Sequence, residues 1–540
     1  MMKHFDSFGV MIDCSRDAVP SVEGLKRFLR TIAKMGYNVA MLYTEETFEV
    51  ENEPYFGYKR GRYSMSELRE IDDYAASLGI ELIPFIQTLA HLNQLKRWRA
   101  YRHKIFDIDD ILLIDEPRTY ELLENIFSTL SKTFRSRRVH IGMDEAHHVG
   151  LGKYLDTHGF TDRYALLLKH LNRVCEIAEK YGFTSTMMAN DLFFNLSPGT
   201  FCTDEVRDFP PEITENVPKN CEMVYWDYFG MQSARYDAMM ISSKKLSEKT
   251  WFSGGAWTWN TFTPHNRYSM KRSEIAIEAC KRNGVRQAFF TLWGDDGSEC
   301  AYEAVLPSLM HAAACARGLS EDEMKREFFE ITGERFDDMK DLDLPNYIFG
   351  ENVPVESPYF QHSACNYCKT HLYDDPFLGI MSAHLPDLDE SLLIGYASRL
   401  HTLANGSLSY ALLYETAACL CDVLSKKLTL AKKTRTLYEK GDKQGLLALA
   451  EGDYADCIRL VDTFHKAFRR QWYAINKTYG FEIHDARLGG LRCRLEGCME
   501  RLVDYANGKV SEIAELEEPL LPYKDTYVTH WSEMISANIV

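Results

Sequence analysis

The sequence predicts an α/β protein, a (β/α)8 TIM barrel followed by an all-helical C-terminal domain. Two observations support this prediction. Over roughly the first 320 residues, amphipathic helices that end at a glycine lead directly into short apolar strands. After that point the strand pattern fades, and long stretches rich in Leu, Ala, Lys and Glu follow. We expect a barrel over residues 1–320, a connecting segment with loops over 321–384, and an α-helical domain over 385–540.

One local pattern occurs four times in the predicted barrel. It covers residues 34–42, 77–85, 180–188 and 282–290. In each copy a glycine ends a helix, because glycine takes the left-handed conformation without the steric cost of a Cβ atom. Ser21 can cap the first helix, whose apolar face repeats at helical spacing. The strands after each glycine are apolar on both faces, which suits a parallel sheet buried on both sides.

Four further apolar runs complete the count of strands. They lie near residues 8–13, 139–143, 222–226 and 251–256. Eight strands that alternate with helices over this length are typical of the (β/α)8 barrel. An open doubly wound sheet is the competing architecture. No Gly-x-Gly-x-x-Gly follows the first strand, which weakens the dinucleotide-binding version of that alternative.

The C-terminal part of the chain predicts long helices. Residues 410–440 and 443–473 have helical periodicity and few helix breakers. Residues 340–384 are richer in Pro, Asp and Tyr, and we interpret them as a linker or a long connecting loop. The role of the helical domain stays open between packing against the barrel and formation of a homodimer.

Composition excludes several classes of protein. The net charge of −17, from 62 basic and 79 acidic residues, argues against nucleic-acid and anionic-membrane partners. No apolar run approaches the length of a membrane span, and the N-terminus lacks the apolar stretch of a signal peptide. The 14 cysteines are mostly single and lie in apolar runs, which favours reduced thiols and a cytoplasmic protein.

A metal site has weak support in the sequence. Cys365, Cys368 and His371 have the spacing of half a zinc site, but no second pair matches them. We therefore expect no metal and no cofactor.

Polar and aromatic residues follow every predicted strand, at the end where barrel enzymes place their active sites. They are Asp13 and Arg16 after the first strand, Glu45 and Glu46 after the second, His91 after the third, Asp144, Glu145, His147 and His148 after the fourth, Asn190 and Asp191 after the fifth, Trp226, Asp227 and Tyr228 after the sixth, Trp257, Trp259 and Asn260 after the seventh, and Trp293, Asp295 and Asp296 after the eighth. Carboxylates among tryptophans suit glycosidic cleavage, since an acid must protonate the leaving oxygen and a flat wall must hold the sugar.

The adjacent pair Asp144 and Glu145 constrains the chemistry. On an extended strand end their side chains point in opposite directions, whereas a two-carboxylate mechanism needs two groups that flank one bond. Neighbours can instead serve one substrate if one protonates the oxygen and the other orients a substrate group. Residues 143–147 also contain the letters of a helicase nucleotide site, but the sequence has no phosphate-binding loop. It also has no His-Glu-x-x-His zinc-protease motif.

These motifs resemble glycoside hydrolase family 20, the β-N-acetylhexosaminidases. His140-x-Gly142-x-Asp144-Glu145 matches the family's His-x-Gly-x-Asp-Glu signature, and residues 9–16 resemble its first-strand Gly-x-x-x-Asp-x-Ser-Arg. Glu45 and Glu46 stand where the family has an Asp pair, residues 89–91 resemble its Pro-Gly-His, and residues 290–295 resemble its closing Trp-Gly-Glu. The matches follow in the right order over residues 8–320, and the helical tail resembles the intracellular branch of the family.

The resemblance implies a catalytic barrel and substrate-assisted catalysis. Glu145 would be the general acid and then the general base. Asp144 would orient the substrate's own 2-acetamido group, whose carbonyl oxygen attacks the anomeric carbon to form an oxazolinium ion. No enzyme nucleophile is then needed. We expect burial to keep Glu145 protonated near neutrality while Asp144 stays charged.

The resemblance also implies the residues that bind the sugar. Arg16 would bind the 3- and 4-hydroxyls, while Asn260 and Asp295 would bind the 4- and 6-hydroxyls. The aromatic walls would come from Trp226, Trp257, Trp259 and Trp293, and His91 and His140 would support the site. The chain departs from the family at Thr258, where a Tyr is usual, and at Ala189, where a Trp is usual. Tyr228 is our candidate to replace that Tyr.

We therefore expect an exo-acting, retaining β-N-acetylhexosaminidase that releases terminal β-linked GlcNAc or GalNAc from oligosaccharides or glycoconjugates. Two alternatives stay open: a barrel β-glycosidase that uses an enzyme carboxylate as its nucleophile, and a sugar-binding barrel without catalysis.

Overall fold

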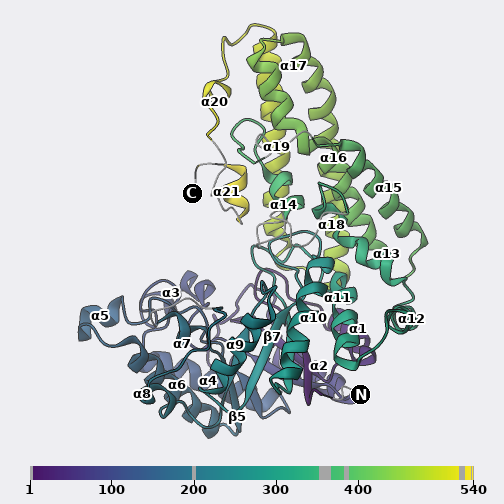
Figure 1. Cartoon of the computed structure of the whole chain (residues 1–540). Helices are drawn as coiled ribbons and strands as arrows, with labels where there is room; N and C mark the ends of the chain where they lie inside the picture. Colours follow the sequence, from purple (N-terminus) through teal and green to yellow (C-terminus); the bar gives the residue numbers. More distant parts are fainter. Residues whose placement is uncertain are drawn as a thin grey trace. The chain divides into compact units, whose positions relative to one another are not determined.

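The computed structural model has a closed barrel of eight parallel strands in the order β1 to β8. Strands β5 and β7 are labelled in Figure 1, with helices of the barrel beside them. The structure describes residues 4–196, 202–351, 366–381, 388–521, 530–536 and 538. The strands are β1 (Ser7–Asp13), β2 (Val39–Tyr43), β3 (Glu81–Phe85), β4 (Arg138–His140), β5 (Ser185–Ala189), β6 (Cys221–Trp226), β7 (Thr250–Gly255) and β8 (Gln287–Leu292). β8 pairs in parallel with β1, which closes the sheet and rules out the open doubly wound alternative.

Helices follow the strands and pack side by side outside the barrel, for example α1 against α2 and α2 against α4. They are α1 (Val22–Met35), α2 (Met65–Ser77), η1 (Asn93–Arg97), α3 (Arg99–Arg102), α4 (Pro117–Thr133), α5 (Lys153–His158), α6 (Arg163–Lys180), α7 (Asp191–Asn195), α8 (Pro211–Thr214), α9 (Ser233–Lys244), α10 (Asn266–Arg282), α11 (Leu306–Arg317) and α12 (Glu321–Thr332).

The predicted helix signals are confirmed at both ends of α1. Ser21 accepts a hydrogen bond from the main-chain N–H of Gly24, and Gly36 ends the helix with φ of 101°. Gly79, Gly182 and Gly284, the glycines of the other three copies of the pattern, also have positive φ. The sequence pattern therefore located these helix ends correctly.

The predicted extent of the fourth strand was wrong. We expected extended chain over residues 139–143, whereas β4 ends at His140. Gly142, Met143 and Glu145 have φ of 68°, 68° and 55°, so the chain turns sharply at once after the strand. Apolar side chains at Ile141 and Met143 are buried in this turn, which is why their letters resemble a strand.

The barrel interior is filled by large apolar side chains. The cluster contains Met11, Val39, Met41, Tyr43, Ile83, Phe85, Met187, Val224, Trp251 and Phe289. Trp251 is fully buried, and its indole N–H donates a 2.6 Å hydrogen bond to Glu222 at the N-terminal part of β6. The interior is thus a packed core and not a channel.

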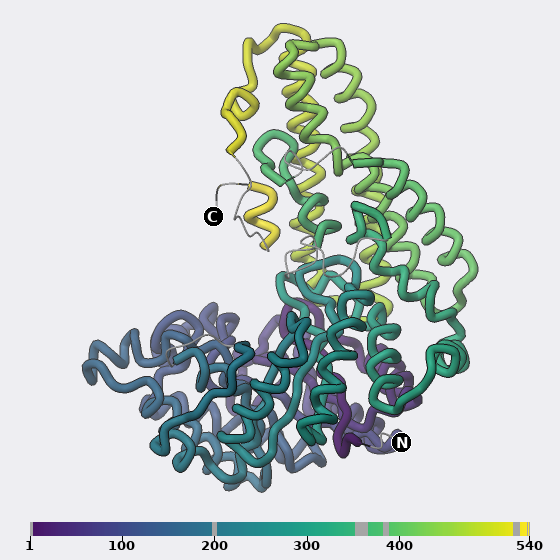
Figure 2. The backbone as a smooth tube through the Cα atoms, in the orientation of Figure 1, coloured from purple at the N-terminus to yellow at the C-terminus, as the bar shows by residue number. Residues whose placement is uncertain are grey.

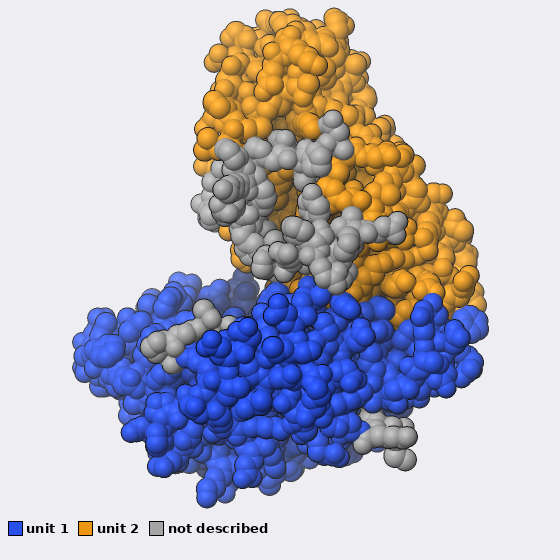
Figure 3. All heavy atoms as spheres, viewed as in Figure 1, with its two compact units in different colours: residues 1–256, 269–293, 308–331 blue, residues 257–268, 294–307, 332–540 orange. Residues whose placement is uncertain are grey.

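The described chain divides into two compact units that alternate along the sequence (Figure 3). The first contains residues 1–256, 269–293 and 308–331, and the second contains 257–268, 294–307 and 332–540. The segments that follow β7 and β8 therefore belong to the second unit, together with the C-terminal helices.

After β8, every regular element in the described ranges is helical, as predicted for the C-terminal domain. Besides α11 and α12, these elements are η2 (Tyr302–Val305), α13 (Phe336–Lys340), η3 (Asp341–Asn346), α14 (Tyr367–Tyr373), α15 (Glu390–Gly406), α16 (Ala411–Glu439), α17 (Lys443–Leu449), the π-helical turn η6 (Ala450–Tyr454), α18 (Ala455–Ile475), α19 (Phe481–Ala506), α20 (Ala514–Glu517) and α21 (Trp531–Ile535). The long helices α15, α16, α18 and α19 pack against one another in that order (Figure 2). Among the described residues, no helix is both long and apolar enough to cross a bilayer.

We predict that Trp251→Ala destabilises the barrel by about 3–5 kcal/mol, because it empties the core and removes the donor to buried Glu222. Trp251→Phe keeps a ring in place and should cost less. Urea unfolding followed by near-ultraviolet circular dichroism measures both. A loss below about 1 kcal/mol for the alanine variant would contradict the assignment of Trp251 to the core.

Candidate active site

The turn after β4 gives Asp144 and Glu145 different surroundings. Gly142 has φ of 68°, and a Cβ atom there would lie 2.1 Å from Oε1 of Gln87. Only a glycine allows this approach of the turn to Gln87. The side chain of Asp144 is 15% exposed, whereas that of Glu145 is 51% exposed. One carboxyl is thus largely buried and its neighbour reaches solvent, so the expectation that Glu145 is buried was wrong.

Asp144 is held as a carboxylate by two side chains. Nε2 of Gln87 donates a 2.8 Å hydrogen bond to Oδ1 of Asp144, and Nε2 of His91 lies 3.2 Å from Oδ2. Burial alone would raise the pKa of Asp144, but the charge of His91 and the hydrogen bonds lower this pKa well below its ordinary value. Asp144 therefore stays ionised throughout the neutral range.

His91 lies between both members of the acidic pair. Its Nε2 is 3.2 Å from Asp144 and 3.6 Å from Oε2 of Glu145. Burial would lower the pKa of His91, but the Asp144 carboxylate raises it to about 10. His91 is therefore a cation at neutral pH, and it balances the charge of Asp144.

Two residues that we did not select from the sequence, Gln87 and Tyr43, connect this pair to β2. Gln87 is fully buried and accepts a 3.2 Å hydrogen bond from the main-chain N–H of Met143. Its Nε2 also donates to the Tyr43 hydroxyl at 3.0 Å, and that hydroxyl donates to Glu45 at 3.0 Å. Gln87 lies just after β3, so its position at a strand end was the available signal.

The two glutamates after β2 face different arginines. Oε1 of Glu45 lies 3.6 Å from the guanidinium of Arg16, whereas Oε1 of Glu46 accepts a 2.8 Å hydrogen bond from Arg60. Burial raises the pKa of Glu45 to about 7, against the opposing effect of Arg16. The pair that looked equivalent in the sequence is therefore split, and only Glu45 contacts Arg16.

Arg16 is oriented by both charge and aromatic rings. Its Nη1 donates a 2.9 Å hydrogen bond to Oδ2 of Asp13. The guanidinium carbon lies 5.0 Å from the ring centre of Tyr43 and 5.1 Å from that of Trp293. Arg16 thus contacts residues from the ends of β2 and β8.

Trp226, Tyr228 and Trp293 form one aromatic group. The indole N–H of Trp293 donates a 2.9 Å hydrogen bond to the hydroxyl of Tyr228. The rings of Trp226 and Tyr228 stack with centres 5.2 Å apart. Burial raises the pKa of Tyr228, so its hydroxyl keeps a proton and can donate a hydrogen bond.

His140 lies inside the barrel below the acidic pair. Its ring stacks on Phe85 at 3.6 Å, and its Nδ1 accepts a hydrogen bond from the main-chain N–H of Gly142. Burial lowers the pKa of His140 to about 3, so the ring is neutral. It supports the turn and does not carry charge.

Five predicted site residues follow β7 and β8. Trp293 belongs to the first unit, whereas Trp257, Trp259, Asn260 and Asp295 belong to the second. Trp257 and Trp259 stack with ring centres 3.8 Å apart, and the main-chain N–H of Asn260 donates to the carbonyl of Asp295 at 3.1 Å. These residues therefore form a local group in that unit.

Charged side chains from the C-terminal helices anchor the segment after Asp295. Nζ of Lys369, which is fully buried, lies 2.8 Å from Asp296 and 2.6 Å from Glu299. The guanidinium of Arg487 also contacts both acids and donates a 2.7 Å hydrogen bond to the carbonyl of Asp296. Residues of the C-terminal helices thus hold this segment at Asp296 and Glu299.

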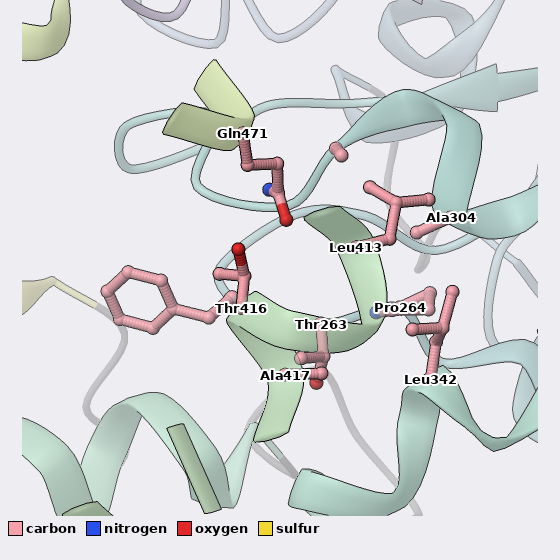
Figure 4. A pocket seen from close by; sticks show the side chains of 10 residues that line it. Thr263, Pro264, Ala304, Leu342, Leu413, Thr416, Ala417 and Gln471 are labelled. Atoms are coloured by element: carbon pink, nitrogen blue, oxygen red, sulfur yellow. The ribbon is translucent and has the colours of Figure 1, made fainter. Parts of the chain in front are cut away.

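Two other kinds of ligand site, a small cavity and a metal site, have less support. A cavity in the second unit beside Thr263, Thr416 and Gln471 has a volume of about 10 Å³, which is room for about one water molecule and not a sugar (Figure 4). Within the described ranges, no three His, Cys, Asp or Glu side chains gather to hold a metal. Cys365 of the possible half zinc site lies outside those ranges.

Comparisons with known proteins relate two parts of the chain to one family of glycoside hydrolases. The catalytic-domain model of glycosyl hydrolase family 20 matches residues 5–181, and the glycoside hydrolase 20C C-terminal domain matches residues 350–536. Hexosaminidase D from Bos taurus is 23% identical over 282 residues, which cover 50% of this chain and 75% of that protein. Hexosaminidase D from Homo sapiens is 24% identical over 223 residues, 39% of this chain and 43% of that protein.

Among solved structures, the GH20 exo β-N-acetylglucosaminidase from Vibrio harveyi is 15% identical with a TM-score of 0.45, over 61% of this chain and 58% of that one. The chain thus spans less than half the length of the human relative and over half of the Vibrio harveyi chain. The first match covers β1 to β4 and the second covers most of the C-terminal helices, and residues 182–349 lie between the two matches. The chain is a glycoside hydrolase and belongs to family 20.

Proposed function

We propose that this chain is an exo-acting, retaining β-N-acetylhexosaminidase that releases terminal β-linked GlcNAc or GalNAc from oligosaccharides or glycoconjugates. The observation that carries the proposal is the unequal pair in one turn. Asp144 is a largely buried carboxylate held by His91 and Gln87, while Glu145 is half exposed. The names of the relatives, hexosaminidase D among them, support a terminal hexosamine as the substrate.

In the proposed reaction Asp144 accepts the N–H of the substrate's acetamido group and turns its carbonyl oxygen toward the anomeric carbon. That oxygen forms the new bond as the glycosidic bond breaks, and Glu145 gives its proton to the leaving oxygen. The resulting oxazolinium ion lies beside the Asp144 carboxylate, whose charge stabilises it. Glu145 then takes a proton from a water molecule, and the water oxygen attacks the anomeric carbon. This attack opens the oxazolinium ring and yields the β-sugar with retained configuration.

The surrounding residues have proposed roles that follow from their contacts. His91 keeps Asp144 ionised, and Arg16, oriented by Asp13, donates hydrogen bonds to sugar hydroxyls. Trp226, Tyr228 and Trp293 supply the aromatic wall and a hydroxyl donor to the acetamido oxygen. Trp257, Trp259, Asn260 and Asp295 remain proposed sugar contacts from the second unit, and His140 a proposed support.

A panel of aryl glycosides tests the proposed activity. We expect cleavage of aryl β-GlcNAc and β-GalNAc, little cleavage of the aryl β-glucoside, and inhibition by a thiazoline that mimics the oxazolinium ion. The reason is that only the acetamido sugars carry the internal nucleophile. Cleavage of the glucoside at a similar rate, or indifference to the thiazoline, favours an enzyme nucleophile. Binding of the sugars without any cleavage favours the inactive barrel.

A second prediction concerns Asp144. Asp144→Asn should lower kcat by on the order of 10²-fold or more, because it removes the charge that stabilises the oxazolinium ion. Asp156→Asn, an exposed change in α5, is the matched control and should leave kcat unchanged. Near-full activity of Asp144→Asn would show that the two acids have been assigned the wrong roles.

The pKa of His91 generates a third prediction. This pKa is about 10 in the folded protein and about 6.5 in the unfolded chain, so the stabilisation from His91 is fully present below pH 6.5 and is lost as the pH rises through 10. The free energy of unfolding of His91→Gln should therefore fall less steeply than that of the wild type between pH 6.5 and 10. Urea unfolding at several pH values measures this, with the exposed His103→Gln as control. Parallel profiles would contradict a charged His91.

A further inference from the structure

A third carboxyl group lies against the acidic pair. Asp191 begins α7, directly after β5, and its side chain is fully buried. Its Oδ2 accepts a 2.9 Å hydrogen bond from the main-chain N–H of Glu145. Its Oδ1 is buried and has no hydrogen-bond partner among the described residues. A buried carboxylate oxygen without a hydrogen-bond partner lowers the stability of the folded protein, and such groups in native structures often have a functional role.

The charges around Asp191 disfavour a second anion. Asp144 and Glu145 face it from the turn after β4, and the cation nearest to that turn, His91, lies against Asp144 and Glu145. No Lys, Arg or His in the described part of the chain forms an ion pair with Asp191. Burial, followed by the charge of Asp144, raises the pKa of Asp191 to about 8, while the Glu145 N–H acts in the opposite direction.

We propose that Asp191 is a positioning residue that, as a neutral carboxylic acid, holds the main chain of Glu145 in the conformation from which Glu145 protonates the leaving oxygen. The inference rests on the proposed function. Glu145 has φ of 55°, a left-handed conformation that costs energy for a residue with a Cβ atom. The hydrogen bond to Asp191 is one interaction that offsets this cost.

The neutral state of Asp191 matters as much as its position. A second negative charge beside Asp144 would compete with it for the positive charge of His91, which lies 3.2 Å from the Asp144 carboxylate. A protonated Asp191 supplies a carbonyl-type acceptor to Glu145 without adding that charge. Its role is thus different from that of Asp144, although both are buried aspartates near the same turn.

Asp191 also has an effect on stability whose sign can be worked out. Its pKa is raised from about 3.9 in the unfolded chain to about 8 in the folded protein. The folded protein therefore binds one more proton over this range, and stability falls as the pH rises from about 4 to about 8. Asp191 destabilises the barrel at neutral pH, which is the pattern expected of a residue retained for activity.

The test compares Asp191→Asn with Asp191→Leu on aryl β-GlcNAc at pH 6. Asparagine keeps a neutral acceptor for the Glu145 N–H, whereas leucine keeps the branched shape, is larger and has no acceptor. We expect Asp191→Asn to keep kcat within about threefold and Asp191→Leu to lose about 30-fold to 100-fold in kcat, with KM changed by less than about threefold. Asp156→Asn again serves as the exposed control.

Two kinetic outcomes would overturn the inference. A loss in Asp191→Asn as large as in Asp191→Leu means that the site needs the charged carboxylate. Full kcat in Asp191→Leu means that the residue only fills space. If the wild type cleaves no aryl β-GlcNAc, it is the proposed function that fails.

Unfolding measurements keep the inference testable without activity and without the leucine variant. The wild type should lose stability relative to Asp191→Asn as the pH rises from about 4 to about 8, and the asparagine variant should be the more stable one at pH 7.5. Equal slopes for the two proteins would show that Asp191 is ionised in the folded state, which contradicts the inference.

Discussion

The Asp144 carboxylate is an ion held largely out of water. Several neighbouring side chains offset the free-energy cost of removing this charge from water. Removing a carboxylate from water is unfavourable by several kcal/mol unless charge and hydrogen bonds replace the water. His91 supplies the charge and Gln87 the hydrogen bond. Gln87 also binds the main chain at Met143, so one side chain holds both the ion and the turn that carries it. Gly142 is required because any larger residue would displace Gln87.

Backbone strain is concentrated at the same end of the barrel. Glu45, His91, Met143 and Glu145 all have positive φ, between 42° and 68°, although none is glycine. Such conformations persist only where the surroundings hold them. Here the surroundings are the packed barrel core and the hydrogen bonds of Gln87 and Asp191. The packed core thus supports strained loops after the strands, and these loops orient the side chains of the site.

Much of the fold could be predicted from the sequence because it depends on local rules. The glycines at 36, 79, 182 and 284 located four helix ends, and apolar runs located all eight strands. The strand-end rule also selected Arg16, His91 and the acidic pair, which lie together in the first unit. The early end of β4 was missed because buried apolar residues in a tight turn give the same sequence pattern as a buried strand.

The tertiary contacts of the site could not be predicted in the same way. The division of Glu45 and Glu46 between two arginines depends on Arg60, which is distant in the sequence. The network of Tyr43 and Gln87 also depends on tertiary packing, because the Gln87 amide contacts Tyr43 of β2 and Asp144 in the turn after β4. A single sequence contains no signal for such pairings.

The interleaving of the two units has a consequence for how the protein can be divided. The segments 257–268 and 294–307 carry Trp257, Trp259, Asn260 and Asp295, yet they fold with the C-terminal helices. Lys369 and Arg487 hold the second of these segments through buried ion pairs. A fragment that stops at the last barrel helix would contain every strand but would leave both segments without their partners. The segments that follow β7 and β8 therefore depend on the C-terminal helices for their buried ion pairs, and a truncation that removes those helices also removes these partners.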